Sequence, residues 1–574
     1  MKLLSLQIDS KFRNLDKGFK IQFHQQDKFD EMVNFNPFCL VGLNGCGKSN
    51  ILEALAQVFY HIELCVGKHL PKVLKNGSNF NPRKCSVNAF TLKYLTLNSN
   101  STSVNQDQVI LVTIYKKVGD SPTMTVMGNG NATAMKFDLG DILFSQASLV
   151  KSFLPQYVVA YSSGENETLS IPFVKSRFIH LFEFQENVEN DVLDYSSPEN
   201  SLIYVDANMS QAILLCCLLF EDEATLTSLK NYEFTGIDSI KKFRMHLREK
   251  SFIMDNQHSY SYFQLFKRNF QGQDIRKKDL FEILKDISTL SWYDEKDKSY
   301  YFDFWVDKAT KQAFRYYFHS AMECFQMFRL LYELNNYAVN SNKQKEIFCS
   351  TGVYTDGKFG IPGADDDVFH FLDFFLKKKM DKEGHDKQEL LLKEFSDGEH
   401  QFIHTMAICL LLKDSNSLIL LDEPETHFNP SWRSKFVSIL NSTLRNACSS
   451  LEQHDERYVN FMKDVLITTH SPFIISDCRS DDVIIVTKHD GATIAENATA
   501  RNIKTYGAST SYLQAKIFGS NDTIGGKAYG DMMEMSKRED VDKADLMDEI
   551  NESFGESMEK MIILGKIRRQ NNAS

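Results

Sequence analysis

The sequence lacks any apolar run long enough to cross a membrane. Its longest apolar stretch is Ala212–Phe220, whereas a membrane-spanning helix needs about 20 predominantly apolar residues. The N-terminal residues become polar at Gln7 and Asp9, so the apolar core of a secretory signal does not develop. These absences speak against a membrane protein and lead us to expect a soluble, cytoplasmic one.

The cysteines form neither a disulfide framework nor a zinc motif. Eleven of them are scattered over 574 residues, without a C-x-x-C pair or a histidine at zinc-ligand spacing. Scattered thiols are typical of a reducing compartment. An excess of positive charge is also missing, because the net charge is −11. The chain as a whole is therefore not built to coat nucleic acid non-specifically, although this charge leaves room for a local basic groove.

Internal repeats and sustained heptads are absent, which argues against a long coiled coil. The 574 residues suggest two to four lobes instead, at about 150 residues per domain. Alternating and apolar segments predict strands at 2–9, 19–23 and 38–41, a helix over 48–63 and a strand-rich stretch at 85–160.

The middle of the chain changes to a helical pattern. Residues 200–345 are expected to form a compact, mainly helical lobe, with a long amphipathic helix over 312–337 and a strand at 300–306. Residues 377–387 are charged and are expected to form a mobile stretch. From 391 to 487 strands and helices alternate again.

A glycine-rich loop lies between the apolar strand at 38–41 and the helix after it. The segment 42–49 reads G-L-N-G-C-G-K-S and matches the P-loop pattern G-x-x-x-x-G-K-S in the context that the motif requires. Glycines let backbone N–H groups curl around a phosphate at a helix N-terminus. Lys48 is expected to reach the β- and γ-phosphates of ATP, and the Ser49 hydroxyl to ligate Mg²⁺. The predicted nucleotide-binding residues here are Asn44, Gly45, Cys46, Gly47, Lys48, Ser49 and Asn50.

Two acids follow an apolar strand some 370 residues later. Residues 418–423 read L-I-L-L-D-E, so a buried strand delivers Asp422 to the Mg²⁺ shell. Glu423 is placed to polarise the attacking water and is a predicted catalytic residue together with Lys48. Standing alone, the motif would more often be a core strand that ends in an acidic turn.

Two further segments indicate the subclass of nucleotide-binding protein. Residues 395–399 read F-S-D-G-E, and the Ser396 hydroxyl at a helix N-terminus suits a γ-phosphate presented by another subunit. Gly398 and Glu399 complete this predicted contact. His470 ends the strand-like segment V-L-I-T-T-H-S-P and is expected to act as a switch histidine in catalysis. The glutamine that contacts Mg²⁺ is expected to be Gln156, and Gln146 is the alternative.

The order of these motifs resembles that of the SMC, RecF and OLD-type ABC ATPases. The segments G-L-N-G-C-G-K-S-N-I-L-E-A-L at 42–55 and L-L-D-E-P-E-T-H at 420–427 are close to the forms in those families. The resemblance covers residues 1–60 and 391–490. It departs at Asp397, where the usual signature has a second glycine. It implies an α/β P-loop NTPase of the ABC/SMC-head type, which binds ATP and Mg²⁺ between two copies of itself.

At a finer level the chain resembles the PtuA ATPases of Septu and retron anti-phage systems. The segments that suggest this are Y-S-S-G-E-N at 161–166, F-S-D-G-E at 395–399 and F-G-E-S-M-E-K at 554–560. This resemblance implies an ATPase that controls a separate HNH nuclease (PtuB), with a reverse transcriptase and its RNA–DNA product (msDNA) as further candidate partners. The rival interpretations are a RecF-like DNA-repair ATPase and a scaffold that binds ATP with little turnover.

Built-in nuclease motifs are poorly supported. His427 and Asn429 mimic part of an HNH motif, but a second histidine at motif spacing is missing. Asp540 and Asp542 have the spacing of a TOPRIM pair, but they open a helix instead of ending an apolar strand. Basic clusters at 244–250, 267–268, 276–278 and 566–569 are interpreted as solvated faces more readily than as nucleic-acid contacts.

The expected organisation has four parts. Residues 1–195 form the first ATPase lobe, 196–385 a mainly helical insertion, 386–490 the second ATPase lobe and 491–574 a helical extension with a helical tail for partner docking. In the tail one amphipathic helix is predicted. Its apolar stripe consists of Leu546, Ile550, Phe554, Met558, Met561 and Ile562.

Overall fold

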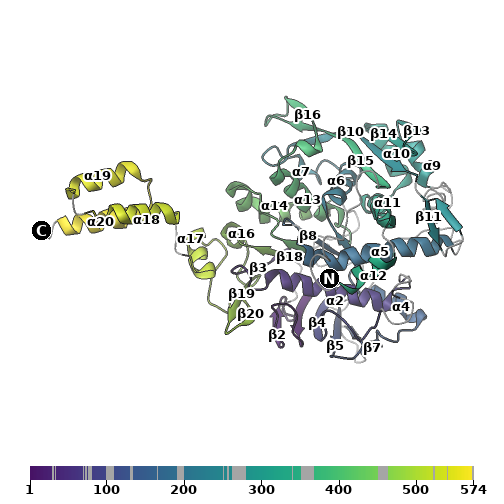
Figure 1. The fold of residues 1–574 in the computed structure, drawn as a ribbon, viewed down its shortest axis with the longest axis horizontal. Coiled ribbons are helices and arrows are strands. Elements are labelled where there is room, and N and C mark those ends of the chain that lie inside the picture. Colours follow the sequence, from purple (N-terminus) through teal and green to yellow (C-terminus); the bar gives the residue numbers. More distant parts are fainter. Residues whose placement is uncertain are drawn as a thin grey trace. The chain divides into compact units, whose positions relative to one another are not determined.

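The computed structural model forms two compact units, residues 1–506 and 507–574, which are described separately (Figure 1). The residues that the structure describes are 1–28, 32, 34–68, 70, 74, 80–97, 109–128, 134–164, 166–189, 200–249, 251–254, 258–261, 280–338, 341–350, 367–449, 463–520, 524–538 and 541–571. Among these residues, none of the helices has both the length and the apolar character that a membrane span needs.

A seven-stranded sheet with the order β20-β19-β3-β18-β17-β8-β9 is the centre of the first unit. Neighbours from β19 to β9 run parallel, and β20 pairs antiparallel with β19. The strands are β3 (Phe38–Val41), β8 (Tyr157–Ser162), β9 (Leu202–Tyr204), β17 (Ser417–Asp422), β18 (Lys463–Thr469), β19 (Val483–His489) and β20 (Ala492–Asn497). Parallel strands buried on both faces read as continuous apolar runs, and every residue of β3, β8, β17 and β18 is buried.

An antiparallel six-stranded sheet with the order β2-β1-β4-β5-β6-β7 shares one core with the central sheet. Its strands are β1 (Lys2–Ile8), β2 (Phe19–Gln22), β4 (Phe90–Leu97), β5 (Val109–Lys116), β6 (Thr123–Gly128) and β7 (Met135–Asp138). Helix α2 (Lys48–Val66) contributes the middle layer of this core, and its residues from Ile51 to Ile62 are all buried. The strands predicted at 2–9, 19–23 and 38–41, the helix over 48–63 and the strand-rich stretch are therefore confirmed.

In the described part of 196–385, helices are accompanied by an antiparallel sheet that the prediction of a mainly helical insertion did not include. Five antiparallel strands form a third sheet with the order β13-β14-β10-β15-β16, and β11 and β12 form a hairpin. The strands are β10 (Ile237–Arg248), β11 (Ser251–Met254), β12 (His258–Ser261), β13 (Leu290–Asp294), β14 (Ser299–Trp305), β15 (Phe369–Lys379) and β16 (Lys387–Leu391). The charged stretch at 377–387, expected to be mobile, belongs to the β15–β16 hairpin. The strand at 300–306 is confirmed.

The helix predicted over 312–337 is broken in two. It forms α10 (Lys308–Tyr317) and α11 (Ala321–Leu334), and the Ser320 hydroxyl caps the second helix by accepting from the Glu323 N–H. The other helices of this region are α5 (Glu167–Glu189), α6 (Ala207–Phe220), α7 (Thr227–Lys230), α9 (Leu280–Ile287), η2 (Asn335–Ala338) and α12 (Ser341–Cys349). The break follows from capping chemistry, because a serine before an acidic first turn starts a new helix.

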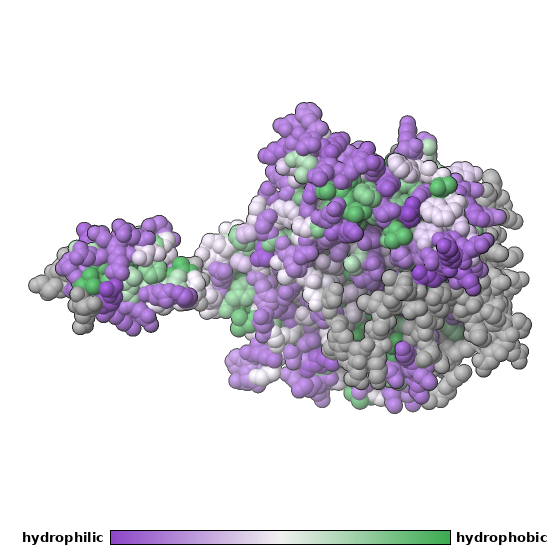
Figure 2. Space-filling model, turned by 45° about the horizontal axis from the view of Figure 1, so that its top comes forward, coloured by the Kyte–Doolittle hydropathy of each residue, from purple (hydrophilic) through white to green (hydrophobic). Residues whose placement is uncertain are grey.

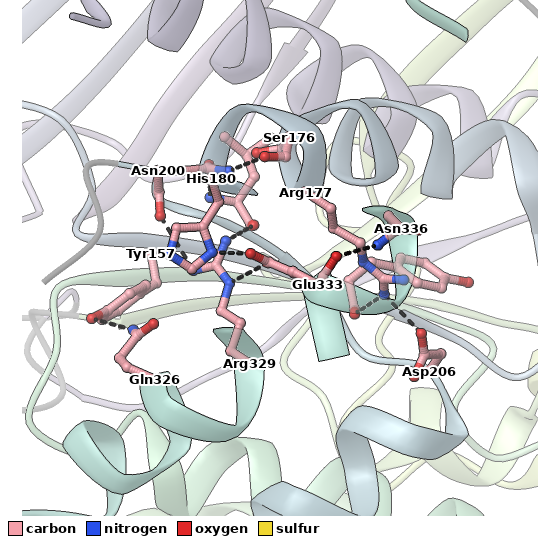
Figure 3. A network of polar contacts seen from close by, with 12 residues as sticks. Tyr157, Ser176, Arg177, His180, Asn200, Asp206, Gln326, Arg329, Glu333 and Asn336 are labelled. Carbon is pink, nitrogen blue, oxygen red and sulfur yellow. Dashed lines mark hydrogen bonds and ion pairs between the residues drawn. The ribbon is translucent and has the colours of Figure 1, made fainter. Parts of the chain in front are cut away.

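Buried charges tie α11 to the edge of the central sheet (Figure 3). The Arg329 guanidinium donates to the Glu333 carboxylate at 2.9 Å and to the backbone oxygens of Asn200 and Leu202 at 3.3 and 3.1 Å. His180 of α5 bonds the other Glu333 oxygen. Burial, together with the Arg329 charge, lowers the pKa of His180 well below its usual value, so the network holds one ion pair and a neutral imidazole.

The remaining helices of the first unit surround the central sheet and the loops at its carboxyl edge. They are α4 (Phe144–Ser152), η3 (Leu392–Glu394), α13 (Asp397–Leu411), α14 (Pro430–Ser449) and α16 (Pro472–Ser476). Because β19 and β20 complete the central sheet, this unit extends to residue 506 and not to 490 as predicted. Hydrophilic residues cover most of the described surface in the view of Figure 2, and apolar ones are scattered among them.

The second unit has a small core of its own. It contains α17 (Thr510–Leu513), η4 (Gln514–Phe518), α18 (Gly526–Met535), α19 (Lys543–Ser553) and α20 (Met558–Asn571). The core residues are Met532, Leu546, Ile550, Ile563 and Ile567. The predicted single amphipathic helix is wrong, because residues 554–557 separate α19 from α20. The stripe is thus divided: Leu546 and Ile550 are buried, whereas Met558, Met561 and Ile562 are exposed.

Candidate nucleotide site

The carboxyl ends of neighbouring parallel strands bring the predicted motifs together. The loop Gly42–Ser49 follows β3, the acids Asp422 and Glu423 end β17, and His470 follows β18. In the sheet β18 lies between β3 and β17. Ligands of open α/β sheets bind at this edge, where the loops leave the strands. The topology therefore explains how motifs nearly 400 residues apart in sequence meet.

The P-loop has the backbone of an anion-binding turn. Gly42, Gly45 and Gly47 have φ values of 148°, 74° and 107°, which place successive N–H groups around a concavity. Helix α2 begins at Lys48, and no side chain caps its first N–H groups. The Lys48 ammonium donates to the backbone oxygens of Gly42 and Leu43 at 3.0 and 3.2 Å. These donors fit the phosphates of a nucleotide.

The loop is supported from outside by residues that lie beyond the P-loop motif. The Thr493 hydroxyl of β20 donates to the backbone oxygens of Asn14 and Cys46 at 2.7 and 3.3 Å. The Asn14 amide donates to the Gly45 oxygen at 3.3 Å. These three contacts join residues that are far apart in sequence, so the motif alone does not predict them. They fix the backbone of the loop without using its own side chains.

The other predicted P-loop residues differ in their surroundings. Asn44 is exposed and Cys46 is buried. The Asn50 amide donates to Glu53, one turn further along α2, at 3.3 Å. The side chains of Cys46 and Asn50 therefore face the protein, so that any contact of these two residues with a phosphate would come from their backbone.

Asp422 accepts hydrogen bonds from four side chains. Its Oδ1 atom accepts from the Ser49 hydroxyl at 2.9 Å and from the Thr468 hydroxyl at 2.6 Å. Its Oδ2 atom accepts from the Asn166 amide at 2.8 Å and from the Ser162 hydroxyl at 3.4 Å. These four donors fix the orientation of the carboxylate. Ser49 and Asp422 provide the oxygen ligands that Mg²⁺ prefers, so the donor set fits this ion. When bound, Mg²⁺ neutralises charge on the β- and γ-phosphates.

Glu423 directly follows the last residue of β17 and has an unusual backbone conformation. Its φ is 51°, a region that non-glycine residues rarely occupy and that recurs at functional sites. Its N–H donates to the Thr468 hydroxyl at 3.0 Å. Burial and the neighbouring Asp422 raise the pKa of Glu423, and Lys48 opposes this. A carboxylate with a raised pKa is a stronger base, as the activation of water requires.

His470, the predicted switch histidine, lies close to the Glu423 side chain. The Nε2 atom of His470 is 3.4 Å from Oε1 of Glu423. Burial lowers the pKa of His470, and the Lys48 charge adds to this against the opposing effect of Asp422. Burial also lowers the pKa of Lys48. At neutral pH the site therefore contains a neutral imidazole beside the Glu423 side chain.

The structure contradicts the prediction that Gln156 contacts the metal. Gln156 precedes β8, and Tyr157 pairs with Ser417 at the start of β17, whereas Ser162 pairs with Asp422 at its end. At about 3.3 Å per strand residue, Gln156 lies roughly 20 Å from Asp422. The alternative, Gln146, lies in α4 before this strand. The side-chain amide beside the Asp422 carboxylate is that of Asn166, which follows the carboxyl end of β8.

The signature segment begins α13 with a capping box. The Ser396 hydroxyl and the Glu399 N–H form its first bond, and Glu399 accepts from the Ser396 N–H at 2.9 Å. Glu399 also pairs with Lys378. A Cβ atom at Gly398 would lie 3.0 Å from the backbone oxygen of His427, so this glycine permits close approach to the loop after Glu423. Ser396 is exposed, and the structure does not bring it to the P-loop of its own chain.

Comparisons with known proteins agree with this geometry in part. A family model described as "AAA domain, putative AbiEii toxin, Type IV TA system" matches residues 274–476. This segment contains the signature, both acids of the Asp422–Glu423 pair and His470, and it begins after the P-loop. No curated protein matches the chain.

Several solved structures of SMC heads are similar to the chain. The SMC head domain from Thermotoga maritima is 11% identical, covers 87% of this chain and 99% of its own length, and has a TM-score of 0.31. An SmcHead bound to the C-winged helix domain of ScpA is 9% identical, with coverages of 87% and 100% and a TM-score of 0.34. The SMC head with a coiled coil and joint from Pyrococcus yayanosii is 12% identical, with coverages of 86% and 97% and a TM-score of 0.29. The α/β P-loop NTPase fold follows from the strand order and the P-loop described above.

Proposed function

We propose that the protein binds ATP with Mg²⁺ and hydrolyses it. The observation that best supports this is the convergence of a P-loop, a strand-end acid pair and a histidine at one edge of the central sheet. Lys48 binds the β- and γ-phosphates, and Ser49 with Asp422 holds the metal. Glu423 polarises the attacking water, and His470 orients Glu423 and contacts the γ-phosphate.

A second copy of the chain is part of this proposal. The Ser396 hydroxyl lies at the exposed N-terminus of α13, which is a favourable place for an anion from another molecule. We infer that two copies assemble head to tail, and that Ser396, Gly398 and Glu399 of one copy complete the nucleotide site of the other. The capping bond to Glu399 then exchanges for a bond to the γ-phosphate.

Glu423→Gln tests the chemistry. The variant keeps the size of the side chain and removes the base, so ATP turnover is expected to fall at least 100-fold, while ATP affinity stays within about three-fold of wild type. The matched control is Glu383→Gln, an exposed glutamate in the β15–β16 turn, which should hydrolyse ATP normally. Equal turnover of Glu423→Gln and wild type would show that Glu423 is not the base.

Mixed assemblies test the composite site. A Lys48→Ala chain and a Ser396→Arg chain are each expected to be inactive alone, because each lacks one half of both sites. Mixed together, they form heterodimers with one intact site and should recover part of the turnover. An absence of rescue in heterodimers verified by tagged co-purification would exclude a shared site.

We extend the proposal to an anti-phage role like that of PtuA ATPases, in which the nucleotide state controls a separate HNH nuclease. Support comes from the resemblance of residues 161–166 and 395–399 and from the toxin described in the matching family model. A reverse transcriptase and its msDNA are further candidate partners. The unit 507–574, with Met558, Met561 and Ile562 exposed, is the proposed docking element, and a cytoplasmic location follows from this role.

Removal of residues 507–574 tests the docking element. Because this unit has its own core, the shortened chain should keep its ATP turnover and lose co-purification of the nuclease encoded beside it. Retention of the nuclease would show that the unit does not dock it. The RecF-like alternative predicts instead that the isolated protein binds DNA at moderate salt, and the scaffold alternative predicts that Glu423→Gln changes nothing.

A further inference from the structure

Three consecutive residues, the last two of β18 and the one after them, each contact a different acid at or after the end of β17. Thr468 donates to Asp422 at 2.6 Å, and His470 lies 3.4 Å from Glu423. Between them, the Thr469 hydroxyl donates to Oε1 of Glu425. In the proposed function, the first contact orients the carboxylate that holds the metal. The second contact orients the residue that polarises the attacking water. The third contact has no role in it so far.

Glu425 is a buried carboxyl group that is only half paired. The residue is 4% exposed, and its Oε2 atom has no hydrogen-bond partner within the described part of the chain. Burial raises the pKa of Glu425 to about 7 against the opposing bond from Thr469. A buried, incompletely bonded carboxyl costs free energy of folding, so its presence two residues after the catalytic base requires an explanation beyond stability.

The backbone of Glu425 is fixed independently of its side chain. Its carbonyl oxygen accepts from the Phe428 N–H at 3.0 Å and from the Arg433 guanidinium at 3.3 Å. The Arg433 bond joins the loop to α14. The backbone of Glu425 is therefore anchored to α14, and one carboxyl oxygen of its side chain accepts a hydrogen bond from β18.

Thr469 links Glu425 to the segment that contains His470. Its hydroxyl donates to Glu425 and at the same time accepts from the Ser471 N–H at 2.9 Å. Ser471 is the N-cap of α16. The residues on both sides of His470 are thereby tied to one hydroxyl group, whose orientation is set by Glu425. Hydrogen bonds that place a catalytic group in this way act through geometry.

We propose that Glu425 is a positioning residue for ATP hydrolysis, which holds His470 against Glu423 through the Thr469 hydroxyl. The inference rests on the proposed ATPase function. The Glu425 side chain is buried against Thr469 and is not among the residues proposed to hold nucleotide or metal. Its loss should lower the rate of the chemical step and leave nucleotide binding intact, because the P-loop and the Asp422 ligand set do not depend on it.

Variants of Glu425 separate positioning from a general effect on the fold. Glu425→Ala removes the acceptor and is expected to lower kcat at least ten-fold, with the KM for ATP within two-fold of wild type. Glu425→Gln keeps a carbonyl acceptor for Thr469 and should retain kcat within about three-fold. Thr469→Val removes the donor at nearly the same volume and should match Glu425→Ala, and the double variant should lose no more than either single one. Glu383→Ala is the matched control for loss of a carboxylate.

The outcomes either support or overturn the proposal. A Glu425→Gln variant as slow as Glu425→Ala, a KM that rises with the fall in kcat, or additive losses in the double variant would each overturn it. A second measurement does not depend on turnover: the ¹³Cε1 NMR signal of His470, assigned by its loss in His470→Gln, should shift in Glu425→Ala and Thr469→Val but not in Glu425→Gln. An unchanged signal also overturns it. Failure of the ATPase function itself would appear separately, as a lack of turnover in wild type.

Discussion

The amide of Asn166 offers a test of how the metal site is built. It donates to Oδ2 of Asp422 at 2.8 Å, and the other donor to this oxygen, the Ser162 hydroxyl, is 3.4 Å away. A hydrogen bond to a charged group contributes about 1.5–3 kcal/mol, which corresponds to roughly 10–150-fold in an equilibrium or rate constant. Removing the partners that orient a metal ligand typically costs about 10–100-fold in metal affinity or activity.

Asn166→Ala is therefore expected to raise the Mg²⁺ concentration for half-maximal ATP turnover, or to lower turnover at saturating Mg²⁺, by at least ten-fold. The assay is phosphate release over a range of Mg²⁺ concentrations at fixed ATP. Ser163→Ala is the matched control, because the Ser163 hydroxyl bonds Thr426 and not the Asp422 carboxylate. If both constants of Asn166→Ala stay within two-fold of wild type, Asn166 does not support the metal site.

The variant Asn166→Asp tests the same reasoning through the pH dependence of Mg²⁺ binding. A second carboxylate 2.8 Å from Asp422 would repel it by about 6 kcal/mol at an effective dielectric constant of 20, so the pair keeps one proton and the pKa of one member rises. That proton must leave before Mg²⁺ binds. The half-saturating Mg²⁺ concentration of this variant should fall as pH rises from 6 to 9, more steeply than in wild type. A slope equal to that of wild type would contradict the proximity of the two groups.

Two further predictions concern stability. Gly42→Ala would place a Cβ atom 2.1 Å from the backbone oxygen of Val486 at a φ of 148°, so we expect a cost of more than ~3 kcal/mol, seen as a lower thermal midpoint and lost ATP binding; a midpoint like that of wild type would contradict the close approach of β3 and β19. Arg329→Met or Glu333→Leu alone leaves a buried charge unpaired and should cost about 3–5 kcal/mol, whereas the double variant should be close to neutral. Additive losses in thermal unfolding would contradict this expectation, because they would show that the two charges contribute independently of each other.

Local patterns predicted the parts of the fold that depend on neighbouring residues. The strand at 38–41, the P-loop and α2 are adjacent in sequence, and a buried strand before a glycine turn has few alternative structures. The middle of the chain was predicted less well. Its sheet residues alternate imperfectly because β10 pairs with β15 through several register shifts, which disturbs the period of two on which strand prediction depends. The result resembles a helical pattern in sequence.

The tail shows a related limit. Leu546, Ile550, Phe554 and Met558 recur every four residues, which predicts one helix, but the chain turns at residues 554–557 and folds α20 back beside α19. A glycine at 555 was the available signal for this turn. Periodicity shows which residues can share a face. It does not show where a helix ends when a second helix can cover the same apolar residues.

Asn166 and Glu425 lie near the proposed nucleotide site, and the motifs did not single them out. Residue type alone favoured Gln156 as the amide near the metal, at the wrong end of its strand. The register of β8 with β17 places residues after Ser162 beside Asp422, and this register depends on contacts about 260 residues apart. In a parallel sheet the carboxyl ends of all strands lie at one edge. Candidate site residues are therefore best sought among the residues that follow each buried strand. Applied to the segment Y-S-S-G-E-N, that rule selects Asn166, and applied to the segment after Asp422 it selects Glu425.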